Sequence, residues 1–178
     1  MKKKFNAGGV IFVFLWLSLI SVILFVPFFQ CLSISNRKNP AQKYYSRDAL
    51  GGFIISYTHS VNKGRVHDFY GCENGKLFLD RTDFVSYGAG ISEVTENPDS
   101  VFFEEDENYS LRGLNRRMKY FYMAVGVIAE HSITIGEEEI FLKEIFAPQT
   151  SLKLEIKRVS LFDYINVSFR CKNVSFRP

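Results

Sequence analysis

Residues 53–70 read FIISYTHSVNKGRVHDFY, two runs of alternating residues joined by the turn-forming Asn62, Lys63 and Gly64. In the first run Phe53, Ile55 and Tyr57 alternate with Ile54, Ser56 and Thr58, and the second run continues the alternation. A period of two, with β-branched and aromatic residues, is typical of half-buried β-strands. A short run of turn residues between two such segments predicts a β-hairpin.

The same alternation recurs after Leu50 in short runs separated by turn residues. Asn74-Gly75 suits the positive φ angles of a type I′ hairpin turn. Residues 118–129 fit either one long strand or a short helix, and the alternation around Gly126 favours the strand. We expect about nine or ten short strands and no strong amphipathic helix after the N-terminal segment. The fold class is therefore all-β, a β-sandwich or a partly closed barrel preceded by a single N-terminal transmembrane helix.

The N-terminal 30 residues predict a membrane anchor. Lys2, Lys3 and Lys4 precede residues 10–29, which carry no charged side chain. About 20 apolar residues at roughly 1.5 Å each cross the roughly 30 Å hydrocarbon core of a bilayer. Lysines before such a segment favour a cytoplasmic N-terminus and a translocated remainder.

A cleaved signal peptide is the competing interpretation of this segment. Cys31, Ser33 and Ser35 are small residues at which a peptidase could cut. The apolar run is longer than a usual secretory segment and ends in the bulky Phe28-Phe29, which favours an uncleaved signal anchor.

Charge and composition divide the chain into three parts. We expect a membrane anchor over residues 1–30, a polar linker over residues 31–49 and an extracytoplasmic β-rich domain over residues 50–178. Without the three N-terminal lysines, 19 of the 22 basic residues remain against 19 acidic ones. A neutral domain has no general attraction for a phosphate backbone, so nucleic acid is not expected as a partner. Cys72 and Cys171 could form a disulfide in an oxidising compartment, or remain as two thiols.

Catalysis and metal binding find little support in the spacing of reactive residues. His59 and Ser60 are adjacent, so in a strand they point to opposite sides and do not form a nucleophile–base pair. His59, His67, His131 and Asp68 could in principle bind a metal, but no His-x-His, His-x-x-x-His or Cys-x-x-Cys spacing occurs. We expect no enzyme, catalytic residue, metal or cofactor. A structural role for His59, facing a carboxylate across the hairpin, fits better.

The glycines of residues 86–91 (SYGAGI) invite comparison with a phosphate-binding loop. The loop lacks the lysine and the following helix that phosphate binding requires. Gly88 and Gly90 are better explained by a close approach of two backbones or by positive φ angles.

Three stretches together resemble the bacterial domain of unknown function 1850 family. They are FIISYTHSVNKGRVHDFY, NGKLFLDRTDFVSYGAGI and VGVIAEHSI, of which the H-S-V and G-A-G motifs are the most specific. The family often has glutamate where Asp68 stands and proline where Ser92 stands. The residues that match in order are Phe53, Tyr57, His59, Ser60, Val61, Asp68, Phe84, Ser86, Gly88, Ala89, Gly90, Ala129 and His131.

The resemblance implies a role beside a transporter. Members of the family are often encoded next to TRAP-type permeases of the subclass that uses TAXI-type substrate-binding proteins. The resemblance implies a non-enzymatic accessory protein, single-pass in the bacterial inner (cell) membrane, whose partner is the permease or its substrate-binding protein. The alternative is an independent metal- or small-ligand-binding extracytoplasmic module. The ligand- or partner-binding residues that we expect are His59, Ser60, Asp68, Gly88, Gly90 and His131.

Overall fold

The computed structural model describes residues 7–60, 63–85, 99–105 and 108–174, with side chains in the last helix as far as Val167. Its elements, in chain order, are α1 (Ala7–Phe25), β1 (Phe29–Asn36), β2 (Lys43–Ser46), the 3₁₀-helix η1 (Asp48–Gly51), β3 (Phe53–Thr58), β4 (Arg65–Glu73), β5 (Lys76–Val85), β6 (Val101–Glu105), β7 (Asn108–Met118), β8 (Tyr120–Ala124), β9 (Ser132–Ile135), β10 (Glu138–Phe141), α2 (Leu142–Ile145), β11 (Ser151–Val159) and α3 (Leu161–Val174).

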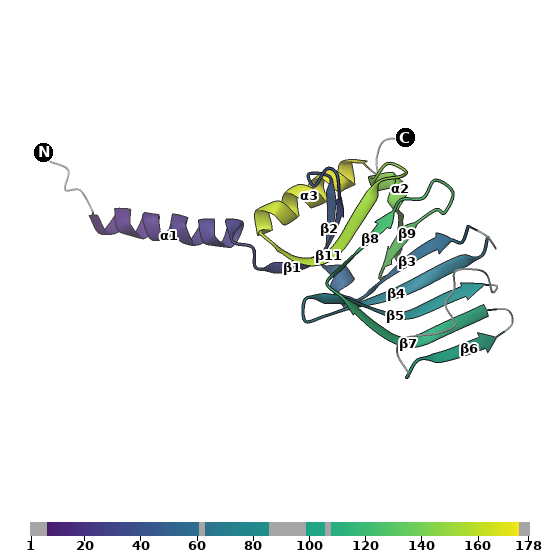
Figure 1. The fold of residues 1–178 in the computed structure, drawn as a ribbon. Helices are drawn as coiled ribbons and strands as arrows, with labels where there is room; N and C mark the ends of the chain where they lie inside the picture. Colours follow the sequence, from purple (N-terminus) through teal and green to yellow (C-terminus); the bar gives the residue numbers. More distant parts are fainter. Residues whose placement is uncertain (1–6, 61–62, 86–98, 106–107, 175–178) are drawn as a thin grey trace, which may run out of the picture.

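The strands form two antiparallel sheets that enclose one core. The smaller sheet has the order β2-β1-β11-β8, and the larger has the order β10-β9-β3-β4-β5-β7-β6 (Figure 1). Leu32 and Leu154 of the smaller sheet pack in the same buried cluster as Phe53, Ile55 and Ile133 of the larger sheet. The predicted fold class, an all-β sandwich behind one N-terminal helix, is confirmed.

The hairpin at residues 53–70 forms as predicted, because β3 and β4 pair from Phe53 opposite Tyr70 to Thr58 opposite Arg65. The next hairpin turns at Asn74 and Gly75, whose φ angles of 51° and 72° are those that a type I′ turn requires. These two turns place β3, β4 and β5 side by side in the centre of the larger sheet.

The linker predicted for residues 31–49 is wrong, because this segment contains two strands and η1. Strand β1 pairs along its whole length with β11 and also with β2, so it lies inside the smaller sheet. Leu32 and Ile34 face the core, and Cys31 lies in a second buried cluster with Tyr45 and residues of α3. The strand is short, and a few apolar side chains are enough to bury both of its faces. The composition of the segment is therefore mostly polar, which is typical of a linker.

Helix α3 was not predicted, although a local pattern marks its start. The Ser160 hydroxyl accepts a hydrogen bond from the Asp163 backbone N–H (3.1 Å) and donates one to Asp163 Oδ2 (3.0 Å). The first bond is the N-cap half of a capping box, and the second joins the two side chains. Tyr164 and Val167 then pack on Cys31, so α3 covers the second face of the smaller sheet.

Among the described residues, α1 is the one helix long and apolar enough to cross a membrane, over Gly8–Phe25 with a mean hydropathy of 2.6. Figure 1 shows α1 projecting from one end of the domain, with α3 beside its C-terminal end. The ends of β3, β5 and β6 lie at the opposite side of the domain in this view. We call this side, where β3 ends and β4 begins, the distal end.

Candidate functional site

A row of polar side chains crosses the larger sheet near its distal end. Ser132, Ser56, His67, Asp83 and Ser110 are direct register partners on β9, β3, β4, β5 and β7. Residues directly opposite each other in an antiparallel pair share one face of the sheet. Because Ile55, next to Ser56, faces the core, this polar row lies on the outer face.

Hydrogen bonds connect the middle of the polar row. Ser56 Oγ lies 2.8 Å from His67 Nδ1, and Ser110 Oγ donates to Asp83 Oδ1 at 2.6 Å. Arg112 Nε donates to Ser110 Oγ at 2.9 Å. The polar side chains therefore fix one another, in the manner of a preorganised binding surface.

Arg65 holds the β9 end of the polar row. Its Nη2 donates to Ser132 Oγ at 2.8 Å and lies 3.2 Å from Glu139 Oε1, while Nη1 donates to the Glu130 carbonyl at 3.0 Å. Ser132 in turn donates to Glu139 at 2.5 Å. The guanidinium thus satisfies a serine that has no exposed surface.

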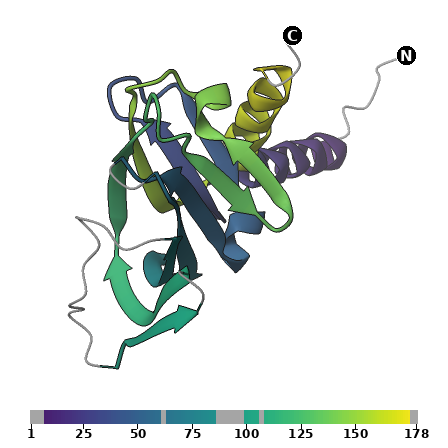
Figure 2. The same ribbon diagram turned by 90° about the vertical axis from the view of Figure 1, so that its right-hand side faces the viewer.

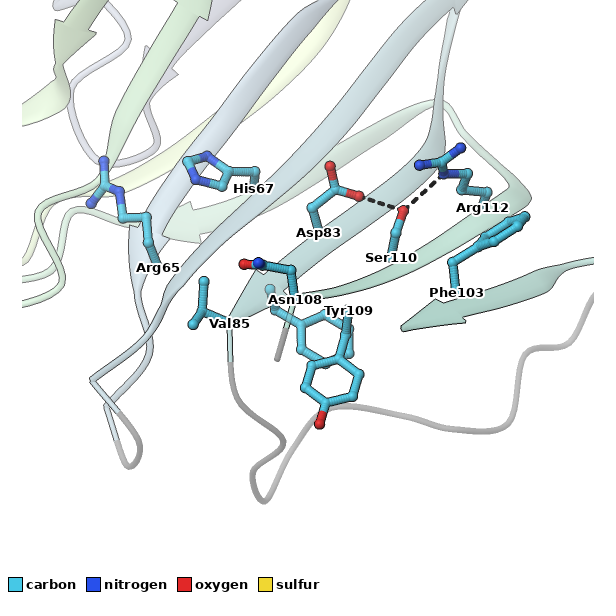
Figure 3. Close-up of a pocket in the computed structure, with 10 residues that line it drawn as sticks. Arg65, His67, Asp83, Val85, Phe103, Asn108, Tyr109, Ser110 and Arg112 are labelled. Carbon is cyan, nitrogen blue, oxygen red and sulfur yellow. Dashed lines mark hydrogen bonds between the residues drawn. The ribbon is translucent and has the colours of Figure 1, made fainter. Parts of the chain in front are cut away.

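A cavity of about 350 Å³ opens over the polar row (Figure 3). Figure 3 shows Arg65 and His67 on one side, Asp83 in the middle, and Arg112 with Phe103 on the other side. The Arg112 guanidinium carbon lies 4.7 Å from the centre of the Phe103 ring. The volume falls in the range of small-molecule sites. The lining residues are Arg65, His67, Asp83, Phe84, Val85, Phe103, Asn108, Tyr109, Ser110 and Arg112.

The surroundings of His67 favour its neutral imidazole. Burial lowers the pKa of His67, the Arg65 charge lowers it further, and the Asp83 and Glu139 carboxylates act in the opposite direction. A neutral ring whose Nδ1 faces Ser56 leaves Nε2 for other partners, and such a ring is a hydrogen-bonding group rather than a charge.

We expect His67 and His131 both to titrate below the ordinary histidine value of 6.5, because burial disfavours each charged ring. The measurement is an NMR titration of the imidazole protons of the full chain in detergent, with His67→Gln and His131→Gln variants to assign the signals. A His67 midpoint above 6.5 would show that the Asp83 charge outweighs burial and would contradict the neutral ring.

Asp68 and His131, two of the predicted site residues, lie on the core face of the same sheet. Asp68 is the register partner of Ile55, and the Thr82 hydroxyl donates to Asp68 Oδ1 at 2.9 Å. The His131 ring stacks on Tyr57 at 5.5 Å between centroids, and its Nδ1 accepts from the Gly126 backbone N–H at 3.0 Å. We call Tyr57, Asp68, Thr82 and His131 the inner cluster.

Burial dominates the electrostatics of the inner cluster. It raises the pKa of Asp68 from 3.8 to about 6, against the lowering effect of the Thr82 hydrogen bond. It also raises the pKa of Tyr57 to about 12, with a further contribution from the Asp68 charge, and it lowers the pKa of His131, as does Arg65. A half-buried carboxylate whose charge acts on a neighbouring tyrosine is the kind of perturbed group that marks candidate functional sites.

The other predicted site residues are placed less completely. The backbone of His59 closes the β3–β4 turn, through its N–H to the Gly64 carbonyl (2.9 Å) and its carbonyl to the Lys63 N–H (3.1 Å). The Ser60 carbonyl accepts from Lys63 Nζ at 2.8 Å. The predicted contact of His59 with a carboxylate stays a prediction, and Gly88 and Gly90 lie outside the described residues.

Cys72 is a free thiol that donates to the Ala49 carbonyl at 3.5 Å. Of the two alternatives for Cys72 and Cys171, a disulfide or two thiols, the free Cys72 fits the second, and the side chain of Cys171 lies outside the described part of α3. Burial raises the pKa of Cys72 to about 11, so the thiol is protonated and a poor nucleophile or metal ligand. Within the described ranges no group of three or more His, Cys, Asp or Glu residues is arranged to hold a metal ion.

A comparison with known families identifies the family of the domain that contains the larger sheet. Residues 53–142 match the model of the domain of unknown function DUF1850. The chain belongs to the DUF1850 family. No curated protein and no solved structure matches the chain.

The matched residues of the DUF1850 domain contain every strand of the larger sheet. They therefore contain the whole polar row and the whole inner cluster. The anchor α1, the strands β1, β2 and β11, and α3 lie outside the match. The family model thus describes the sheet that carries both candidate sites, while the remaining elements attach that sheet to α1.

Alternation predicted the strands but not the polar row, because a row requires the register of five strands at once. Counting outward from the turn at Lys63 and Gly64 pairs Ser60 with His67 and His59 with Asp68. The structure instead pairs Ser56 with His67 and Ile55 with Asp68, because β3 already ends at Thr58 and the connection is longer than the predicted turn. The partners Asp83 and Ser110 depend on two register shifts, at Phe69/Tyr70 between β4 and β5 and at Leu79/Arg81 between β5 and β7, which composition does not reveal.

Proposed function

We propose that this protein is a non-enzymatic accessory protein of a TRAP-type (TAXI) solute transporter. In this proposal α1 anchors it in the bacterial inner (cell) membrane, and its DUF1850 domain stands on the extracytoplasmic side. The transporter association comes from the family resemblance. The geometry that supports the proposal is the short connection between α1 and the first strand of the domain.

The observation that carries the proposal is the length of the connection between anchor and domain. Helix α1 ends at Phe25 and β1 begins at Phe29, so three residues join them. Three residues span at most about 10 Å even when fully extended. The domain is therefore held against the membrane surface, at a height where a permease or a docked substrate-binding protein would meet it.

The position of β1 also favours an uncleaved anchor. A peptidase that cut near Cys31, Ser33 or Ser35 would cut inside β1, which pairs with both β2 and β11. Removing half of an internal strand would leave buried backbone groups of both neighbours without partners, at a cost that a small domain does not tolerate. Retention of α1 is the outcome compatible with this fold.

The polar groups support binding rather than hydrolysis. The Ser56–His67 pair has a hydrogen-bonding distance of 2.8 Å, but only 2% of Ser56 is exposed, so a substrate carbonyl cannot reach its hydroxyl. Asp83, which would complete a triad, accepts from Ser110 and pairs with Arg81 Nε at 3.3 Å. These contacts suit a fixed surface that recognises a polar partner.

Co-purification tests the proposal. The tagged full chain, expressed together with a TAXI-type TRAP permease and its substrate-binding protein, is expected to elute with one of them in a mild detergent. Arg112→Gln, at the cavity, is expected to weaken this association, because Arg112 is fixed by Ser110 and stacked on Phe103. Arg117→Gln, on the same strand but outside the cavity, is the matched control, and we expect it to behave like the wild type.

A chain that elutes alone while both transporter components are present would contradict the proposal. The cavity would then favour the second candidate function, an independent module that binds a small ligand between Arg65 and Arg112. Equal loss of association with Arg112→Gln and Arg117→Gln would place the contact outside the cavity.

A further inference from the structure

Helix α3 begins beside the C-terminal end of α1. The rings of Phe25, the last residue of α1, and Phe162, in the first turn of α3, have centroids 5.3 Å apart. Figures 1 and 2, which differ by a quarter turn, both show the two helices side by side at this end of the domain. The pairing joins the start of the last helix to the end of the anchor.

The described part of α3 has two different faces. Val167 is 7% exposed and, with Tyr164, packs on the smaller sheet. Phe162 and Ile165 are 48% and 41% exposed. Residues three apart lie on one side of a helix, so these two apolar side chains form a single outward face. Phe28, 44% exposed in the connection after α1, adds to the apolar surface at this end.

The depth of this surface follows from α1. The apolar span runs over Gly8–Phe25, so Phe25 marks the end of the hydrocarbon-crossing segment. A ring whose centre is 5.3 Å from that of Phe25 is at nearly the same depth, whatever the tilt of α1. The layer between acyl chains and headgroups accepts aromatic side chains and the apolar face of a helix lying in its plane.

Charge around the apolar face fits the same layer. Arg47 lies over the Phe29 ring at 5.4 Å, and exposed Arg158 is the register partner of Gln30, two residues after Phe28. Basic side chains at this height can reach lipid phosphates while their stems cover apolar surface. Leaving these apolar side chains in water, when lipid is a few ångströms away, is less favourable than burying them in the lipid.

We propose that the outer face of α3, formed by Phe162 and Ile165, is buried in the headgroup–acyl boundary of the bilayer that α1 spans. The inference rests on the proposed membrane anchoring by α1. Two contacts, α1 and α3, then hold the domain, so its tilt is fixed and the distal end with the polar row points away from the lipid. A single flexible tether would not fix this orientation.

Tryptophan quenching in vesicles tests the proposal. The full chain has one tryptophan, Trp16, in the middle of α1. The chain is reconstituted in phosphatidylcholine vesicles whose acyl chains carry bromine either near the headgroup or near the bilayer centre. Phe162→Trp in a Trp16→Phe background is expected to lose fluorescence most with bromine near the headgroup. Ile165→Trp in the same background is the second probe and is expected to respond in the same way.

Two further measurements make every outcome decisive. Trp16 of the wild type is expected to lose fluorescence most with bromine near the bilayer centre, which reports α1 alone. Val101→Trp in the Trp16→Phe background, on β6 far from α1, is the matched control and is expected to be quenched by aqueous acrylamide but not by brominated lipid. If Trp16 is quenched while both α3 probes behave like the control, the α3 contact is refuted and the anchor stands. If Trp16 itself is not quenched by lipid, both the anchor and the α3 contact are refuted.

Discussion

Replacing Leu32 with alanine is expected to lower the free energy of unfolding by about 2–5 kcal/mol, the usual cost of removing a large aliphatic side chain from a core. Leu32 has no exposed surface and packs between the two sheets with Leu154 and Phe53. The neighbours are strands and cannot collapse into the space. The measurement is denaturant unfolding of the full chain in mild detergent, followed by near-ultraviolet circular dichroism.

Gln30→Ala is the matched control, since Gln30 is an exposed residue of the same strand. We expect its effect to stay within about 0.5 kcal/mol, as for most surface substitutions. A Leu32→Ala variant as stable as the wild type would mean that residues 31–49 behave as a linker, and the assignment of β1 as an internal strand would be rejected.

Local chemistry predicted the central hairpins of the larger sheet. The β3–β4 hairpin follows from two alternating runs around a short turn, and the β4–β5 turn follows from Asn74-Gly75, which takes the positive φ angles that few residues tolerate. Both features depend on residues close in the chain. The sandwich class followed from repeating the same argument, but of the eleven strands in the described residues β1 and β2, which precede residue 50, were not predicted.

The elements that were missed depend on distant partners. Strand β1 is stabilised by pairing with β11, more than a hundred residues later. Its own sequence has few apolar residues, so it does not by itself indicate a strand inside a sheet. Helix α3 shows only the short Ser160–Asp163 cap in its sequence. Its apolar residues serve two environments, the smaller sheet and the outer face, so no single apolar stripe indicates the helix.

The residues of the candidate site, too, were predicted only in part. Resemblance to the family named Asp68 and His131 among six expected site residues, and the structure places these two on the core face beside Tyr57. Neither spacing nor resemblance indicated the polar row on the opposite face. The two groups are separated by the thickness of one sheet, because His67 and Asp68 are neighbours in β4 whose side chains alternate.

Asp68 makes the fold less stable at neutral pH, and its removal is expected to show this. Its folded-state pKa of about 6 exceeds the ordinary value of 3.8 because the carboxylate is buried. Below pH 3.8 the group is protonated in both states and has no net effect. As pH rises from 3.8 to 6 the unfolded chain ionises Asp68 while burial keeps the folded-state group protonated, so stability falls across this window and the loss is complete above about pH 6. A difference of about two pKa units corresponds to about 3 kcal/mol above pH 7.

Asp68→Asn is therefore expected to be more stable than the wild type by about 1–3 kcal/mol at pH 8, and equally stable at pH 4. The amide cannot ionise, yet its oxygen can still accept the hydrogen bond from Thr82. Unfolding free energies of both proteins between pH 4 and 8 provide the measurement. His67 and His131 act in the opposite sense, because a lowered folded-state pKa costs stability as pH falls below 6.5. Both proteins share that contribution, so the difference between their profiles isolates Asp68.

Asp80→Asn, at an exposed position of β5, is the control and is expected to leave the pH profile unchanged. A difference between Asp68→Asn and the wild type that does not vary with pH would show that the Asp68 charge is not the cause. A pH-dependent gain in stability of Asp68→Asn would show that Asp68 lowers the stability of the fold. Residues that lower stability in this way are concentrated at functional sites. That result would make the inner cluster, with its carboxylate next to Tyr57, the first place to look for what the DUF1850 domain binds.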